Sequence, residues 1–255
     1  MSVDLELKGR NALITGGTKG IGRAIANILA DEGANVAVCA RQKSEIDEAV
    51  SALSTRGVKA SGRALDVGDG AALTAWVHDV AREFGGLDIV IPNVSALAIG
   101  SDEESWRKEF EIDMLHTVRV VNAAMPYLEK SDAAAIVIIS SVSGREIDFA
   151  AGPYGAFKAA LIHYAQGLAF QNAAKNIRVN SVSPGNTYFK GGVWEQIEHG
   201  NPTLFAQALA LNPTGRMAKP EEVARGAVFL ASPAASFITG TNLLVDGALT
   251  RGVQY

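Results

Sequence analysis

A tyrosine and a lysine four residues apart could carry out proton transfer. Tyr154 and Lys158 stand at the start of a segment with helical periodicity, so both side chains are expected on one face of one helix. A phenol with an ordinary pKa of about 10 is a poor proton shuttle at neutral pH, but a nearby ammonium favours the phenolate and lowers that pKa. The pair therefore predicts a general acid and base, Tyr154, whose pKa is adjusted by Lys158.

Ser141 is the third candidate for this chemistry. It follows the apolar residues Ile138 and Ile139, which are typical of the end of a buried strand. Its hydroxyl could hydrogen-bond a substrate oxygen and stabilise the charge that grows there during hydride transfer. A Tyr-x-x-x-Lys spacing alone is more often structural than functional. Its combination with Ser141 and a glycine-rich turn favours hydride transfer.

That turn lies between the first apolar run and the helix that follows it. The segment Thr15-Gly-Gly-Thr-Lys-Gly-Ile-Gly22 has glycines whose missing side chains let the backbone approach a pyrophosphate at the positive end of the helix. An ordinary glycine-rich turn is the alternative, but its place directly after a strand and before a helix favours a dinucleotide. The candidate cofactor contacts are Gly16, Thr18, Lys19, Gly20, Ile21 and Gly22.

A cation after the second predicted strand favours NADP(H). About 20 residues after such a turn, an acid holds the ribose 2'-hydroxyl, whereas an arginine accommodates a 2'-phosphate. This chain has Arg41 there, and Lys19 adds a second positive charge. Both could instead be solvated surface cations, so NAD(H) is also possible. Asp66 and Val67 are candidates for contacts with the adenine, although Asp66 could also be a helix cap or turn acid.

The elements that must position these residues alternate along the chain. Predicted strands cover residues 11–15, 35–40, 59–65, 87–91, 134–140, 177–182 and 242–245, and predicted helices cover residues 20–32, 43–56, 69–84, 102–129, 153–174 and 220–231. Strands that are apolar on both faces need helices on both sides. The expected fold is a single α/β domain, residues 1–255, with a doubly wound, seven-stranded parallel sheet. Ligands of such sheets bind at the carboxyl ends of the strands, where the strand order reverses.

Composition excludes several classes of protein. The formal charge is -4 without a Lys/Arg cluster, which argues against nucleic acid as a partner. The apolar runs are shorter than the roughly 20 residues that cross a bilayer, and the N-terminus lacks a signal pattern, so we expect no membrane association and a cytoplasmic location. The single cysteine, Cys39, lies in an apolar run and is expected to be buried. We expect no metal ion.

One segment does not fit the alternation of strands and helices. Residues 186–217 form a long insertion, of the kind that often serves as a lid or binding loop, and we assign it to substrate with Gly191 and Gly192 as a hinge. The pocket mouth is expected to be partly aromatic, unless these residues only pack the loop. The candidates are Ser143, Ile147, Phe149, Tyr188, Trp194 and Phe205.

Taken together, these pieces resemble the short-chain dehydrogenase/reductase family, in its subgroup of about this chain length, over nearly the whole sequence. The matching pieces are the turn 15–22, Asp66-Val67, Ser141, Tyr154 with Lys158, Ser183-Pro184-Gly185, and the closing segments 240–241 and 245–247. The resemblance implies a Rossmann-type fold, hydride exchange with a nicotinamide ring, Lys158 on the nicotinamide ribose, and a homotetramer. It also implies that Pro184 and Gly185 flank the nicotinamide and that Thr187 bonds its carboxamide.

The sequence departs from the family pattern after the fourth predicted strand. Members usually carry Asn-Asn-Ala-Gly there, whereas this chain has Pro92, Asn93, Val94 and Ser95. Proline removes a backbone donor, and the two following residues add bulk where small residues let the cofactor pass. Only Asn93 is kept as a cofactor contact.

A second departure affects the catalytic group. The family's fourth catalytic residue is an asparagine that anchors a relay water, and Asp113 stands at that position. Its charge is expected to raise the pKa of Tyr154 unless a cation compensates. His116, three residues later, could supply part of that charge, but a packed or surface histidine is the favoured interpretation.

The sequence thus predicts an NADP(H)-dependent oxidoreductase that interconverts a secondary alcohol and a ketone. Two alternatives stay open. One is a catalytically idle module that binds NADP(H) as a sensor or scaffold, which Asp113 and Pro92 modestly favour. The other is redox-linked epimerisation or lyase chemistry by the same residues.

Overall fold

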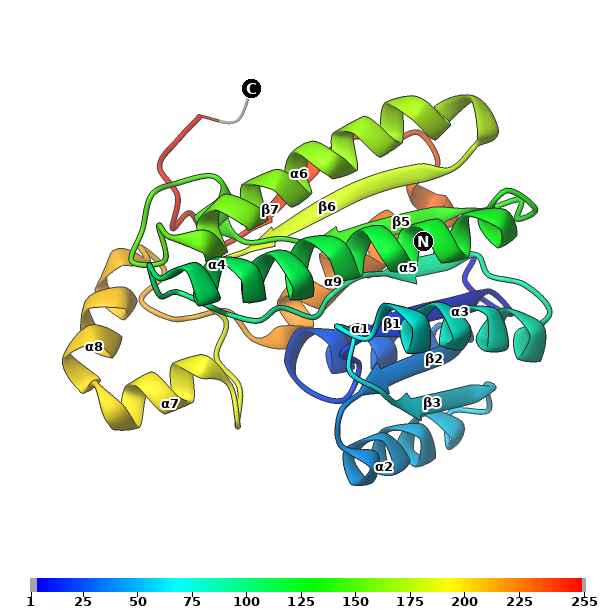
Figure 1. Cartoon of the computed structure of the whole chain (residues 1–255), viewed down its shortest axis with the longest axis horizontal. Coiled ribbons are helices and arrows are strands. Elements are labelled where there is room, and N and C mark those ends of the chain that lie inside the picture. The colour runs from blue at the N-terminus through cyan, green and yellow to red at the C-terminus, as the bar shows by residue number, and fades with distance from the viewer. Residues whose placement is uncertain (1–3, 254–255) are drawn as a thin grey trace.

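The computed structural model describes residues 4–253 and contains a seven-stranded sheet in which all neighbouring strands are parallel. The strands are β1 (Asn11–Thr15), β2 (Asn35–Ala40), β3 (Ala60–Ala64), β4 (Ile89–Ile91), β5 (Ala135–Ile139), β6 (Arg178–Pro184) and β7 (Asn242–Val245). Their order in the sheet is β3-β2-β1-β4-β5-β6-β7, so the chain winds outward in both directions from the β1/β4 pair (Figure 1). The predicted doubly wound parallel sheet is confirmed.

Helices cover both faces of this sheet. One face carries α3 (Gly70–Phe84), α5 (His116–Leu128) and α6 (Pro153–Asn172), and the other carries α1 (Gly20–Asp31), α2 (Lys43–Ser54) and α9 (Pro220–Ala231). Successive strand residues alternate between the two apolar clusters. In β1, Leu13 packs with α3, α5 and α6, whereas Ala12 and Ile14 pack on the opposite side. The strand is apolar throughout because both of its faces are buried.

The sheet opens a crevice at the carboxyl ends of its central strands. β1 pairs with β2 on one side and with β4 on the other, and the winding direction reverses between β1 and β4. The connections that leave β1 and β4 therefore diverge, and side chains at the ends of these strands face a shared space. β6 ends at Pro184, two residues later than predicted, because Pro184 still pairs with Val245 of β7.

The predicted helix over residues 102–129 is interrupted. It consists of α4 (Glu103–Glu109), a π-helical turn (Phe110–Leu115) and α5. Such wider turns occur mostly as single turns inside α-helices and are frequent at functional sites. The wider turn changes the directions in which the side chains of these residues point. Periodicity in the sequence does not reveal such a turn.

The insertion 186–217 is only partly a loop. It contains α7 (Val193–Gly200) and α8 (Pro202–Leu211), and both lie beyond the carboxyl edge of the sheet, at the left of Figure 1. Their own apolar cluster is built on Trp194, Ala208 and Met217. One-turn 3₁₀ helices stand elsewhere, at Val142–Gly144, Ala173–Lys175 and Pro233–Ala235.

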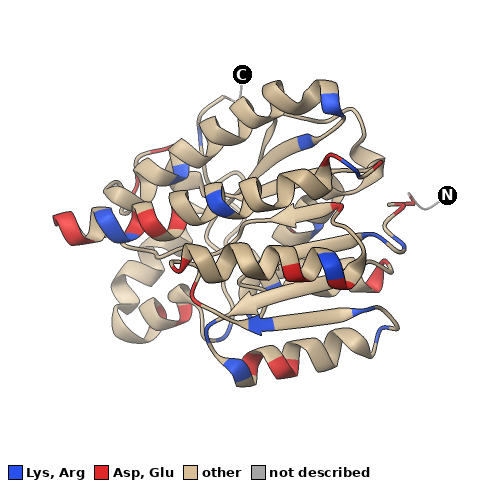
Figure 2. Cartoon of the chain, turned by 45° about the vertical axis from the view of Figure 1, so that its right-hand side comes forward, with Lys and Arg blue, Asp and Glu red and all other residues tan. Residues whose placement is uncertain are grey.

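Charged residues of both signs are interspersed over the outer elements (Figure 2). Among residues 4–253, no helix combines the length and the apolar character needed to span a bilayer.

Candidate active site

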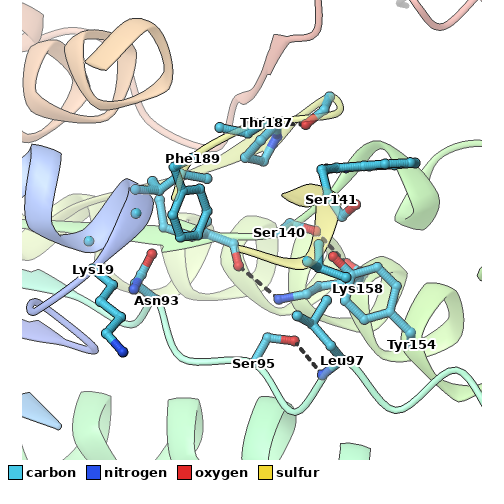
Figure 3. Close-up of a pocket in the computed structure, with 18 residues that line it drawn as sticks. Lys19, Asn93, Ser95, Leu97, Ser140, Ser141, Tyr154, Lys158, Thr187 and Phe189 are labelled. Atoms are coloured by element: carbon cyan, nitrogen blue, oxygen red, sulfur yellow. Dashed lines mark hydrogen bonds between the residues drawn. The ribbon is translucent and has the colours of Figure 1, made fainter. Parts of the chain in front are cut away.

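A pocket of about 250 Å³ lies at the carboxyl edge of the sheet. Its wall combines the glycine-rich turn, the loop after β4, the end of β5, the start of α6 and the loop after β6. Figure 3 shows Lys19 and Asn93 at one end and Tyr154 at the other. The predicted site residues that line it are Lys19, Gly20, Ile21, Gly22, Asn93, Ser141, Tyr154, Lys158, Pro184, Gly185, Thr187 and Trp194. The predicted residues outside its lining are Gly16, Thr18, Arg41, Asp66, Val67, Asp113, Ser143, Ile147, Phe149, Tyr188 and Phe205.

Ser141, Tyr154 and Lys158 meet because α6 begins directly beside the end of β5. Gly144 permits this close packing, since a Cβ there would lie 2.6 Å from the carbonyl carbon of Lys158. The Ser140 hydroxyl donates to the carbonyl oxygen of Lys158 at 2.8 Å and fixes the same contact. Nζ of Lys158 lies 5.6 Å from the centre of the Tyr154 ring, and Ser141 is close enough to the phenol to lower its pKa.

Burial raises the pKa of Tyr154 above its ordinary value in this structure. Lys158 and Ser141 both act to lower that pKa, as the sequence predicted for Lys158, but the loss of solvent around the phenol outweighs them. The net direction is therefore opposite to the expected one. The sequence indicated the ammonium but not the depth at which the phenol is buried.

Lys158 forms a buried ion pair with Asp113. Nζ lies 2.9 Å from Oδ2 of Asp113, and the two side chains are 2% and 0% exposed. Nζ also donates to the carbonyl oxygen of Ile139 at 3.2 Å, and Oδ1 of Asp113 accepts from the backbone N–H of Ala96 at 2.8 Å. The negative charge of Asp113 raises the pKa of Lys158 against the opposing effect of burial. Lys158 is thus the cation that compensates Asp113.

His116 does not share this role and is instead a packed histidine, the interpretation that the sequence favoured. Its Nδ1 lies 2.9 Å from the carbonyl oxygen of Ile112 and must donate, so Nε2 accepts from the Thr15 hydroxyl at 2.9 Å. Burial lowers the pKa of His116 to about 4, so the ring is neutral at physiological pH. Thr15 also accepts from the backbone N–H of Asn93 at 3.0 Å. His116 therefore ties the end of the π-helical turn to the end of β1.

This buried histidine predicts a loss of stability in mild acid. The unfolded chain binds a proton on His116 below its ordinary pKa of about 6.5, whereas the folded chain binds it only near pH 4. The unfolded state therefore holds more protons between these values, and the free energy of unfolding falls by up to about 3 kcal/mol as the pH drops from 6.5 to 4. Urea unfolding at several pH values should show this slope reduced in His116→Gln. The exposed His163 provides the control His163→Gln, which should match the parent, and equal slopes in all three proteins would contradict the prediction.

The glycine-rich turn leaves the N-terminus of α1 without a side-chain cap. Gly22 is required by close approach, because a Cβ there would lie 2.3 Å from the carbonyl oxygen of Gly16. Lys19 is the N-cap residue, and its side chain accepts no hydrogen bond from the first turn. The free N–H groups and the helix dipole suit a phosphate. The ring of Phe189, which the sequence did not single out, packs over Gly20 beside this end of the helix.

A carboxylate that the sequence did not indicate faces the proposed phosphate cations. Glu45 of α2 pairs with Nζ of Lys19 at 2.7 Å and accepts from the Thr18 hydroxyl at 3.3 Å. Arg41 directly follows β2 and is exposed. Glu45 therefore balances one of the two cations, and Arg41 is left as the more available positive charge.

The two adenine candidates are placed differently from one another. Asp66 is exposed, and its Oδ1 accepts from the backbone N–H of Gly68 at 2.9 Å, as in a turn. The helix cap of α3 is Asp69, which accepts from the N–H groups of Ala71 and Ala72. Val67 is buried in the cluster on the α3 side of the sheet.

The segment after β6 brings Thr187 to the pocket. Its hydroxyl donates to the carbonyl oxygen of Gly185 at 3.0 Å. The oxygen of the Thr187 hydroxyl can still accept a hydrogen bond, and a carboxamide N–H would need such an acceptor.

Among the predicted substrate contacts, only Trp194 lines the pocket. Its buried ring packs edge to face against Phe149 at 5.7 Å, and Phe205 packs 6.5 Å away. The Tyr188 hydroxyl donates to Glu198, and its ring packs against Phe205 at 6.1 Å. Tyr188, Trp194 and Phe205 belong to the apolar cluster of α7 and α8, the alternative that the sequence left open.

Ser143 supports Ser141. The backbone N–H of Ser143 donates to Oγ of Ser141 at 3.2 Å, and its own hydroxyl donates to Asp148 at 2.6 Å. Ile147 and Phe149 instead line a separate cavity of about 440 Å³ between this segment and α8.

The structure adds a second buried acid behind the pocket. Glu109 ends α4, is fully buried, and accepts from the backbone N–H of Ala98 at 2.8 Å. A signal was present in the sequence, because an acid four residues before Asp113 lies on the same side of a helix.

Comparisons with known proteins agree on the family. A family model described as enoyl-(acyl carrier protein) reductase matches residues 16–250. The isoepoxydon dehydrogenase of Penicillium expansum is 42% identical over 254 residues, 98% of each chain. A short-chain dehydrogenase from Burkholderia cenocepacia in complex with NADP shares 30% identity at a TM-score of 0.87, over 96% of this chain and 99% of that one. An NAD⁺-bound xylitol dehydrogenase shares 25% identity at a TM-score of 0.89, over 95% and 100%. With its described fold and pocket, this chain belongs to the short-chain dehydrogenase/reductase family.

Proposed function

We propose that the protein is an NADP(H)-dependent oxidoreductase that interconverts a secondary alcohol and its ketone. One observation carries the proposal: Ser141, Tyr154 and Lys158 meet at one end of a pocket whose other end is the uncapped N-terminus of α1 (Figure 3). A proton-transfer group and a phosphate site in one crevice are what hydride exchange with a dinucleotide requires.

The donor set fits a nicotinamide dinucleotide. The turn Gly16–Gly22 and the free N–H groups of α1 would hold the pyrophosphate, and Thr187 would orient the carboxamide. When bound, the dinucleotide supplies or accepts the hydride.

The side chains of this protein provide the proton chemistry. In ketone reduction, Tyr154 donates its phenolic proton to the carbonyl oxygen as negative charge grows there, and in alcohol oxidation its phenolate takes the hydroxyl proton. Ser141 donates a hydrogen bond to the same oxygen. Lys158, kept charged by Asp113, stabilises the phenolate.

The pocket favours a substrate with an apolar side. Leu97, Val193 and Trp194 line the pocket together with Ser95. The most informative trial substrates follow from the relatives: isoepoxydon and other cyclic alcohols, xylitol and other polyols, the matching ketones, and an enoyl thioester for the reaction in the family model's description.

Nicotinamide absorbance should report turnover of at least one alcohol or ketone of this set with NADP(H). Calorimetry in parallel should show that the dinucleotide binds. Binding without turnover of any compound would favour the idle sensor or scaffold, and turnover of the enoyl thioester alone would replace the carbonyl reaction. Epimerisation or lysis would give product without net change of the nicotinamide.

Arg41 is expected to decide the preference for NADP(H). Arg41→Asp should lower kcat/KM for NADP(H) relative to NAD(H) by tenfold or more, because a charged hydrogen bond to the 2'-phosphate contributes roughly 1.5–3 kcal/mol. Lys130→Asp, at the opposite edge of the sheet, makes the same change in charge and should leave the ratio of the two values unchanged. An unchanged ratio in Arg41→Asp would show that Arg41 does not contact the phosphate.

The homotetramer and the cytoplasmic location stay predictions. Light scattering of the purified protein would test the first, and imaging of a tagged full-length chain would test the second.

A further inference from the structure

Two buried carboxyl groups are held side by side behind the pocket. Glu109 and Asp113 are both fully buried and stand four residues apart across the junction of α4 and the π-helical turn. Each has one oxygen fixed by the loop after β4. Ala98 N–H donates to Oε2 of Glu109 and Ala96 N–H donates to Oδ1 of Asp113, both at 2.8 Å. The two groups therefore have defined positions.

Their other two oxygens are the unusual feature. Among the described residues, buried side-chain polar atoms without a hydrogen-bond partner are Oε1 of Glu109, Oδ2 of Asp113 and the distant Nε1 of Trp76. Oδ2 has Lys158 as a charge partner at 2.9 Å, outside good hydrogen-bond geometry, while Oε1 has none. The carboxyl groups are close enough to hydrogen-bond each other. One proton between these two acceptors would give each a hydrogen bond, and without it Oε1 of Glu109 has no partner while Oδ2 of Asp113 has only the ion pair with Lys158.

The surrounding charges favour that proton. The titratable groups that face Glu109 are Asp113 on the π-helical turn and, on α6, Lys158 with Tyr154 beside it, while the loop after β4 contributes only N–H groups. Two carboxylates against one ammonium would leave a net buried charge, whereas one shared proton leaves the ion pair neutral. Burial and the charge of Asp113 raise the pKa of Glu109 to about 8.

We propose that Glu109 shares a proton with Asp113 and is a positioning residue that acts on Tyr154 through the Asp113–Lys158 pair. This proposal rests on the proposed function for its catalytic consequence. With the proton in place, Lys158 is balanced by one negative charge and can stabilise the phenolate. When Glu109 ionises, its charge disfavours the phenolate, so Tyr154 keeps its own proton to higher pH.

The pH profile of alcohol oxidation tests the catalytic part. Oxidation needs the phenolate, so log kcat/KM rises with pH as Tyr154 ionises. Glu109→Gln keeps an acceptor for Ala98 and a donor for Asp113 but cannot ionise, and its rising limb should shift by about one unit to lower pH. The matched control is Glu111→Gln, two residues later on the π-helical turn, whose carboxylate pairs with Arg119 and whose loss should leave the profile unchanged.

Infrared spectroscopy tests the shared proton without any turnover. The cofactor-free protein labelled with ¹³C-glutamate should show a protonated carboxyl band at pH 7 that disappears as the pH rises through about 8. The band should be absent from Glu109→Gln and present in Glu111→Gln. Absence of the band from the parent protein at pH 7 would overturn the proposal even if Glu109→Gln does not fold. If the parent shows the band but the pH profiles of kcat/KM are identical in the parent and Glu109→Gln, the positioning role is overturned. If no substrate is turned over, the infrared test still decides whether the proton is shared.

Discussion

Tyr154→Phe is expected to lower kcat by about 10²–10⁴-fold, while the affinity for NADP(H) changes little. The substitution removes the hydroxyl that exchanges a proton with the substrate oxygen, but it keeps the ring that packs near Nζ of Lys158. Ser141 can still hydrogen-bond that oxygen, so residual activity above background is expected.

Stopped-flow measurement of the hydride step and calorimetry of dinucleotide binding would check both parts of this prediction. Tyr164→Phe is the matched control, because Tyr164 lies on the same helix α6 and packs against the core. It should keep the parent rate. A Tyr154→Phe enzyme with more than a tenth of the parent kcat would show that another group moves the proton.

Lys158→Met should destabilise the protein as well as inactivate it. The ammonium is the charge partner of a fully buried carboxylate, and removing one member of such a pair costs about 3–5 kcal/mol because the other is left uncompensated. Activity should fall to background, since burial already raises the pKa of Tyr154 and Lys158 is the main group that opposes this.

A double variant separates the two effects. Lys158→Met combined with Asp113→Asn removes the uncompensated charge, so urea unfolding should show much of the stability regained, while catalysis stays lost. If Lys158→Met alone is as stable as the parent, Asp113 takes up a proton at little cost when the ammonium is removed. Recovery of activity in the double variant would mean that Lys158 does not act on the phenol.

The structure also explains how an aspartate fits at a position where the family pattern has asparagine. A lone carboxylate near Tyr154 would oppose the phenolate. Here Asp113 sits directly on the ammonium of Lys158 and next to the carboxyl of Glu109. Glu109, Asp113 and Lys158 form one group of interacting charges. The effect of Asp113 on the phenolate of Tyr154 therefore depends on the other two residues.

The sequence by itself determined the order of strands and helices, the doubly wound sheet and the segments that meet at its carboxyl edge. These features follow from local patterns: apolar runs that alternate with helical periodicity, the glycines at 16–22 and the spacing of Tyr154 and Lys158 each act over short stretches of chain. The family pattern then connected them into one candidate site.

Tertiary structure alone decided which charges meet. Asp113 and Lys158 are 45 positions apart in the chain, and Lys19 meets Glu45 from another helix, so neither pair follows from local pattern. The π-helical turn, the neutral His116 and the buried Glu109 depend on how α4 and α6 pack over the loop after β4. Ionisation is set by burial and by neighbours within a few ångströms, and both exist only once the chain has folded.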